Sequence, residues 1–94
     1  MEHAPYLEHA SHPEIVKRLK RAQGHLAAIV TMIEDGRPCV DLAQQLYAVE
    51  MAITNAKRVL IEDHMAHCLG DGVAAGDVPA NAALGEFKAL AKYL

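Results

Sequence analysis

Between Pro38 and Gly70 the chain contains no glycine and no proline, and no other feature constrains its fold as much. Because these two residue types interrupt helices most strongly, the stretch predicts one helix of about 30 residues, far longer than the usual mean of about 12. Its apolar residues recur every three or four positions and form one broad stripe. A helix this long and this apolar needs packing partners on more than one side.

A second helix is predicted before the long one. Ser11 opens a Ser-His-Pro-Glu pattern, in which Ser11 is the N-cap residue and Glu14, three residues later, completes a capping box. The apolar spacing continues to about Asp35, and Gly36 is well placed to end this helix as a C′ glycine.

After the long helix, Gly70 and Gly72 are expected to end it and to open a glycine-rich loop that Pro79 closes. A short third helix should follow from about Ala80 to Tyr93. No stretch shows the alternation of a β-strand. The composition, 52% hydrophobic but only 4% aromatic, also suits helix packing better than a β-sandwich. The predicted fold class is therefore all-α, with three helices.

The 94 residues suffice for one small domain, expected over 11–94, after a polar arm over 1–10 that we expect to be flexible. Three helices in so short a chain cannot enclose a deep core, so we expect the long helices to pair in an antiparallel dimer. The chain shows no signal peptide and no apolar run near the roughly 20 residues that span a bilayer. These features indicate a cytoplasmic protein without a membrane partner, in a compartment where thiols are usually reduced.

Cys39, His64 and Cys68 are the strongest candidates for a metal site. His64 and Cys68 are four residues apart, so they share one face of a helix. Cys39 precedes His64 by about 25 residues, or roughly 37 Å of helix, whereas a thiolate approaches a metal to about 2.3 Å. The three can bind one ion only if Cys39 comes from another subunit. Two thiolates and one imidazole suit Cu(I), or Zn(II) with a fourth ligand.

Simpler interpretations of these residues stay open. The two cysteines could be small buried apolar residues, or they could join across subunits in a thiol-redox regulator. His67 could join the metal site or face the solvent. His3, His9 and His12 could supply additional nitrogen ligands, or the arm could have no role in binding.

Positive charges are concentrated locally, although the formal net charge is −3. Lys17, Arg18 and Arg21 share one broad face of the first predicted helix, and Lys57 and Arg58 form a second basic pair. Such a polarised surface could bind DNA phosphates, or it could be an ordinary solvated face. The helices are too long for a helix-turn-helix motif.

Enzyme motifs are weak in this chain. It has no glycine-rich phosphate loop, no serine nucleophile motif and no obvious pair of catalytic carboxylates. We therefore expect neither an enzymatic activity nor a small-molecule substrate. A metal-buffering helical bundle without a role at DNA remains an alternative.

Residues 15–69 resemble the copper-sensing operon repressor family (CsoR/RcnR), and the last predicted helix does so more loosely. The resemblance rests on Arg-Leu-Lys-Arg-x-x-Gly-His, a cysteine soon after the first helix, Gln-Gln-Leu-x-Ala-Val, and Asp-His-x-x-x-Cys at the end of the long helix. It implies a three-helix protomer, an antiparallel dimer and a tetramer of two dimers. It further implies that the metal-free form binds operator DNA, through Arg18 with its neighbours and Arg58. Effector binding at the dimer interface would lower DNA affinity and derepress an efflux or detoxification gene.

The same resemblance implies a ligand set made of Cys39 from one subunit with His64 and Cys68 from the other. Glu86 is the best match for the glutamate that links the metal site to the DNA surface in copper sensors. Pro38 stands where some copper sensors carry a tyrosine.

The resemblance makes Cu(I) the first expectation for the effector, while Ni(II), Co(II) and Zn(II) stay open. Nickel and cobalt sensors often add a histidine from the N-terminal arm. Persulfide sensors usually lack the central histidine, so His64 argues against that class. Formaldehyde sensors combine the equivalent of Cys39 with an N-terminal proline, whereas Pro5 is not at the terminus.

Overall fold

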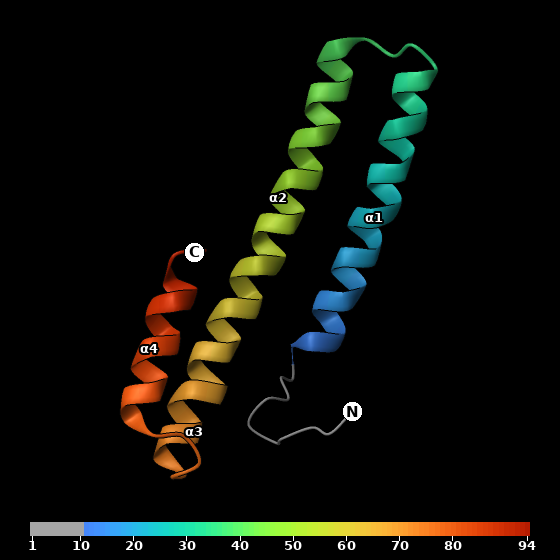
Figure 1. Ribbon diagram of the computed structural model, residues 1–94. Helices are drawn as coiled ribbons and strands as arrows, with labels where there is room; N and C mark the ends of the chain where they lie inside the picture. The colour runs from blue at the N-terminus through green and yellow to red at the C-terminus, as the bar shows by residue number, and fades with distance from the viewer. Residues whose placement is uncertain (1–10) are drawn as a thin grey trace. The chain divides into compact units, whose positions relative to one another are not determined.

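The computed structural model describes residues 11–94, apart from the side chain of Cys68, and every regular element there is helical. The elements are α1 (His12–Glu34), α2 (Cys39–Asp63), the π-helix η2 (His64–Gly70), α3 (Asp71–Ala74) and α4 (Ala80–Ala91) (Figure 1). The prediction of an all-α fold is confirmed for this part of the chain. Residues 1–10, which include the predicted arm with His3 and His9, lie outside it.

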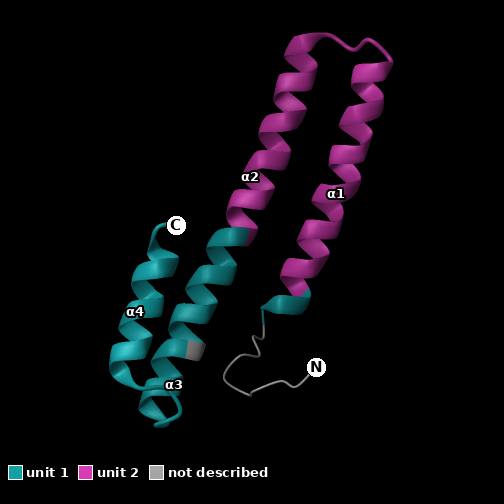
Figure 2. Cartoon of the chain, viewed as in Figure 1, with its two compact units in different colours: residues 1–13, 57–94 teal, residues 14–56 magenta. Residues whose placement is uncertain are grey.

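The chain divides into two compact units (Figure 2). Unit 2 is Glu14–Ala56, a hairpin of α1 and the first part of α2. In the described part of the chain, unit 1 combines residues 11–13 with residues 57–94, and so contains the end of α2, η2, α3 and α4. Across residues 11–94, no helix has both the length and the apolar character needed to cross a bilayer.

The turn between α1 and α2 forms where the sequence predicts it. Gly36 has a φ of +76°, its N–H donates to the carbonyl of Ile33, and the N–H of Arg37 donates to the carbonyl of Met32 at 3.0 Å. This is a Schellman motif, which needs a residue with positive φ and therefore favours glycine. The predicted C′ role of Gly36 is confirmed, and α2 begins just after Pro38.

Unit 2 buries only part of the apolar faces that the sequence predicts for its two helices. Ile29 is 1% exposed, and it shares the hairpin core with Ile15, Ala22, Val49 and Ala56. Other apolar residues of these two faces are 44–54% exposed. These are Leu19, Leu26, Val30, Ile33, Leu46 and Ile53. Part of each apolar face therefore closes the hairpin, and the rest remains on the surface.

The prediction that Gly70 and Gly72 end the long helix is wrong. Gly70 is helical, with φ −62° and ψ −55°, and the chain continues through α3 to Ala74. The residue that ends this helix is Gly76, with φ +81°. Its N–H donates to Val73, and the N–H of Asp77 donates to the carbonyl of Gly72, which repeats the Schellman pattern of the first turn.

Close packing explains why position 72 is a glycine, although the helix does not end there. It is buried, and a Cβ atom there would lie 2.9 Å from Cγ2 of Val78. Pro79 then adopts an extended conformation and α4 begins, as predicted. Within unit 1, α4 packs against η2, and Leu69 and Ala83 are buried.

Gly72→Ala should therefore lower the free energy of unfolding by about 1–3 kcal/mol, because Val78 or the backbone must move to admit the methyl group. Gly85→Ala is the matched control, since Gly85 lies inside α4 with no atom near the position of a Cβ. We expect that control to raise the free energy by about 0.5–1 kcal/mol through helix propensity. Urea unfolding at one fixed protein concentration measures both. Equal effects of the two substitutions would contradict the packing explanation.

Candidate metal and nucleic-acid sites

Two of the predicted metal ligands, His64 and Cys68, lie in the π-helix η2 together with His67. A π-helix is rare, and short π segments inside α-helices occur frequently at functional sites. The sequence pattern predicted an ordinary α-helix here and gave no sign of the wider turn. The backbone geometry therefore changes at the segment that carries these residues.

Helix α4 places Glu86 against His64 within unit 1. Oε1 of Glu86 lies 2.6 Å from Nε2 of His64, whose side chain is only 16% exposed. Since a carboxylate can only accept, the imidazole donates through Nε2. Metal-binding histidines usually donate their second ring N–H to such a partner, which fixes the ring and its tautomer. The contact joins the two residues that the resemblance connects, while the ligand and relay roles remain predictions.

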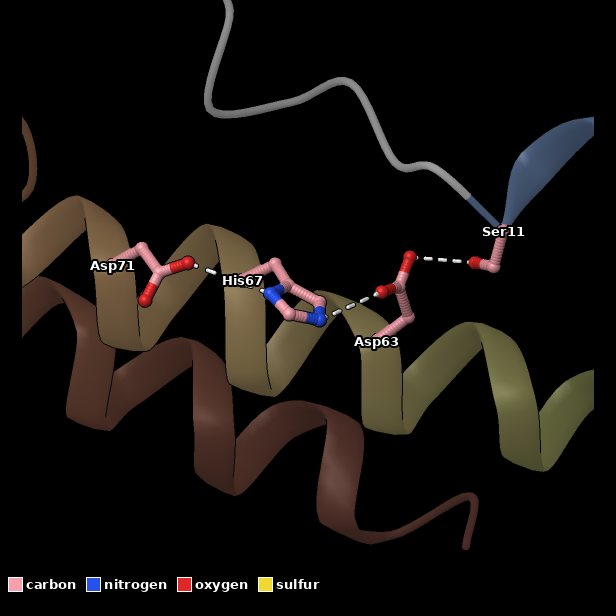
Figure 3. A network of polar contacts seen from close by, with 4 residues as sticks. All are labelled: Ser11, Asp63, His67 and Asp71. Carbon is pink, nitrogen blue, oxygen red and sulfur yellow. Dashed lines mark hydrogen bonds and ion pairs between the residues drawn. The ribbon is translucent and has the colours of Figure 1, made fainter.

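A second polar network joins Ser11, Asp63, His67 and Asp71 (Figure 3). His67 lies between two carboxylates, with Nε2 3.4 Å from Oδ1 of Asp63 and Nδ1 3.4 Å from Oδ2 of Asp71. The hydroxyl of Ser11 donates to Oδ2 of Asp63 at 2.5 Å. Asp63 immediately precedes His64, so this network ties residue 11 to the start of η2. His67 is 63% exposed, and its proposed ligand role stays a prediction.

Cys39 is a free, exposed thiol at the first position of α2, whereas His64 directly follows the last residue of the same helix. Over residues 11–94 no three His, Cys, Asp or Glu residues form a group that could hold a metal ion. The side chain of Cys68 is not among the parts that the structure describes, so that observation does not include it. The Cys39–His64–Cys68 set therefore remains a prediction. The additional candidate His12 is half-buried at the start of α1.

Two of the predicted DNA-binding residues, Arg18 and Arg21, line a hollow of about 490 Å³ in unit 2, which we call the basic hollow. Its other polar lining residues are Glu14, His25 and Asn55. The sequence pattern had assigned Glu14 to helix capping alone and had not singled out Asn55.

Glu14 contacts both arginines of the basic hollow. Its Oε1 lies 3.6 Å from Nε of Arg18 and 3.8 Å from Nη2 of Arg21. On the same hairpin, Nε2 of His25 lies 2.5 Å from Oε1 of Gln45, a hydrogen bond that joins α1 to α2.

The remaining candidates for DNA binding are exposed side chains. Lys17 lies on α1 in unit 2. Lys57 and Arg58 lie on α2 at the start of its part in unit 1. Their participation in DNA binding stays a prediction.

Comparison with known proteins places the chain among metal-responsive regulators. A family model described as metal-sensitive transcriptional repressor matches residues 11–92. The copper-sensing transcriptional repressor CsoR of Bacillus subtilis is 42% identical over 74 residues, which cover 76% of this chain and 73% of that protein. The copper-sensing transcriptional repressor RicR of Mycobacterium tuberculosis is 36% identical over 73 residues, which cover 78% of this chain and 76% of that protein. No solved structure matches the chain significantly.

Proposed function

Because this chain belongs to the family of metal-sensitive transcriptional repressors, we propose that its metal-free form binds operator DNA and that Cu(I) binding releases it. The similarity to two copper-sensing repressors is the observation that carries the choice of copper. Release would allow expression of an efflux or detoxification gene. The family match over residues 11–92 supports treating 11–94 as one functional domain.

We propose that Cys39, His64 and Cys68 hold the ion. Two thiolates and one imidazole are soft or borderline donors, which suit Cu(I) better than Ni(II) or Co(II). The contact between His64 and Glu86 supports the assignment, because the carboxylate already fixes the ring through Nε2. In this arrangement Nδ1 is the nitrogen that His64 would offer to the metal. The bound ion would supply positive charge and a preferred geometry that rearranges its ligands.

An antiparallel dimer would unite these ligands, and α2 supports that assembly in two ways. Cys39 opens α2 and His64 directly follows its last residue, so a reversed copy of α2 would bring Cys39 of one chain near His64 of the other. The exposed apolar residues of α1 and α2 also need cover, since soluble monomers rarely expose large contiguous apolar surfaces. A second copy of the chain fits both requirements, and two such dimers would form the tetramer.

DNA binding is assigned to the basic residues of α1 and α2. Arg18 and Arg21 converge on the basic hollow, and Lys17, Lys57 and Arg58 add exposed positive charge. Contacts of this kind hold the phosphate backbone and carry no base sequence information directly. Metal binding would change the packing around η2 and reduce DNA affinity, with a coupling free energy of about 1–3 kcal/mol per effector.

Fluorescence anisotropy on a DNA duplex from the region upstream of the gene that encodes this protein tests the proposal. The reduced, metal-free protein should bind at low salt, lose affinity steeply as salt rises, and dissociate when Cu(I) is added without oxygen. If no duplex binds at low salt, the repressor function is wrong and a metal-buffering bundle becomes the better interpretation. Release by Ni(II) or Co(II) but not by Cu(I) would reassign the effector.

Glu86→Ala should separate metal binding from DNA release. In the parent, we expect Cu(I) to lower DNA affinity by about 5- to 150-fold, the usual range of allosteric coupling. Without the carboxylate on His64, we expect Cu(I) still to bind but most of this drop to be lost. Anisotropy titrations with and without Cu(I) measure the ratio of the two affinities.

Asp71→Ala is the matched control for Glu86→Ala, because it removes a carboxylate that contacts His67 and leaves the contact between His64 and Glu86 intact. If the Glu86→Ala protein releases DNA as the parent does, Glu86 does not link the metal site to the DNA surface.

A further inference from the structure

Glu14, Arg18 and Arg21 follow one another at helical spacing on α1, and the single carboxylate faces both guanidinium groups. Its Oε1 lies 3.6 Å from Arg18 and 3.8 Å from Arg21. All three side chains are substantially exposed, between 43% and 74%. The pairs are therefore weak and open to exchange with a competing anion in solution.

The basic hollow contains donors for an anion and one obstacle to it. Arg18, Arg21 and Asn55 can all donate hydrogen bonds, whereas Glu14 is the only acidic residue among those that line the hollow. A phosphate oxygen and a carboxylate oxygen seek the same guanidinium N–H groups. A phosphate that approaches these arginines therefore also meets the negative charge of the Glu14 carboxylate, which repels it.

Building on the proposed DNA-binding role of these arginines, we propose that Glu14 is an internal competitor for DNA phosphate. In the free protein its carboxylate forms ion pairs with Arg18 and Arg21 that offset part of their positive charge, and a backbone phosphate must compete with it for them. Glu14 then lowers the affinity of the metal-free repressor for DNA. A repressor held less tightly needs a smaller change in free energy to be released by its effector.

A stabilising role in α1 is the competing explanation, because an acidic residue in the first turn interacts favourably with the helix dipole. Glu14→Gln separates the two roles. Glutamine retains a good helix propensity and can still serve in a capping box, but it removes the charge that competes with phosphate. Glu34→Gln removes the same charge from the last residue of α1, roughly 30 Å away and beyond the Debye length of about 10 Å at 0.1 M salt.

The experiment measures binding of a random-sequence duplex by anisotropy over a series of salt concentrations, using the reduced, metal-free protein. We expect Glu14→Gln to bind roughly two- to tenfold more tightly at low salt, with a steeper dependence on salt, and the difference to shrink as salt rises. Glu34→Gln should bind as the parent does. Circular dichroism should show the same helix content in all three proteins.

A double-mutant cycle completes the test. If the carboxylate acts through the arginines, the gain from Glu14→Gln should fall when Arg18→Ala is also present. A gain of the same size in Glu34→Gln, or no gain in Glu14→Gln while the parent binds duplex, would overturn this inference alone. Absence of duplex binding by the parent and by Glu14→Gln would overturn both this inference and the repressor function.

Discussion

Cys39→Ala should abolish the response to copper while leaving DNA binding by the metal-free protein intact. Cys39 is an exposed free thiol at the start of α2, so its removal costs little packing. The loss of one of three ligands should weaken Cu(I) binding by at least about 100-fold, since changes even beyond the ligands commonly cost about 10- to 100-fold. Competition with a colorimetric Cu(I) chelator measures the affinity, and anisotropy with added Cu(I) measures the release of DNA.

Val40→Ala is the matched control for Cys39→Ala. Val40 is the next residue of α2 and is 69% exposed, so truncation there changes the same surface without removing a thiol. We expect its copper affinity and DNA release to equal those of the parent. If Cys39→Ala instead loses DNA binding in the metal-free state, the cysteine has a structural role and the ligand assignment is wrong.

Arg18→Ala should weaken DNA binding roughly 10- to 100-fold near 0.1 M salt, because every copy in a symmetric assembly loses a phosphate contact at the same time. The loss should be nearly equal for operator and random sequences, since phosphate contacts do not read bases. The slope of affinity against salt should fall by about 1 for each contact removed. Anisotropy titrations on both duplexes, over several salt concentrations, provide all three quantities.

Arg37→Ala is the matched control for Arg18→Ala. Arg37 is another exposed arginine, but it lies in the turn after α1 and pairs with Asp41 at 3.9 Å. Its removal should change neither the affinity for DNA nor the salt slope to a comparable degree. An Arg18→Ala protein with an unchanged slope would show that this arginine does not contact phosphate.

The sequence predicted the helices well because local signals mark most of their ends. Gly36 ends α1 with its positive φ, and Pro79 precedes α4, as expected from their backbone preferences. The end of the long helix was predicted wrongly, because Gly70 and Gly72 come first in the sequence, whereas Gly76 is the glycine that adopts a positive φ. Close packing against Val78, rather than a helix end, accounts for the glycine at position 72, and local sequence rules do not include such a contact.

The candidate sites were predictable only in part. The spacing of Cys39, His64 and Cys68 pointed to a shared metal, and the resemblance singled out Glu86, which the structure places 2.6 Å from His64. The proposed competition of Glu14 with DNA phosphate could not be foreseen. A capping role was sufficient to explain this residue until its distances to Arg18 and Arg21 were known.

Local sequence rules also missed the π-helix and the hydrogen bond between Ser11 and Asp63. These two residues are 52 positions apart, and their contact depends on how the end of α2 packs with the first described residues of the chain. The π-helix η2 contacts α3 and α4, and the contact with α4 is likewise invisible to local rules.

Mixing two defective proteins tests the shared metal site most directly. Cys39→Ala and Cys68→Ala subunits, unfolded together and refolded as a mixture, should regain about a quarter of the parent's Cu(I) sites, because half of the dimers are mixed and each of these contains one complete site. Each variant refolded alone should bind no copper tightly. A mixture that binds no more copper than its separate components would show that one chain supplies all the ligands, and the antiparallel site would be wrong.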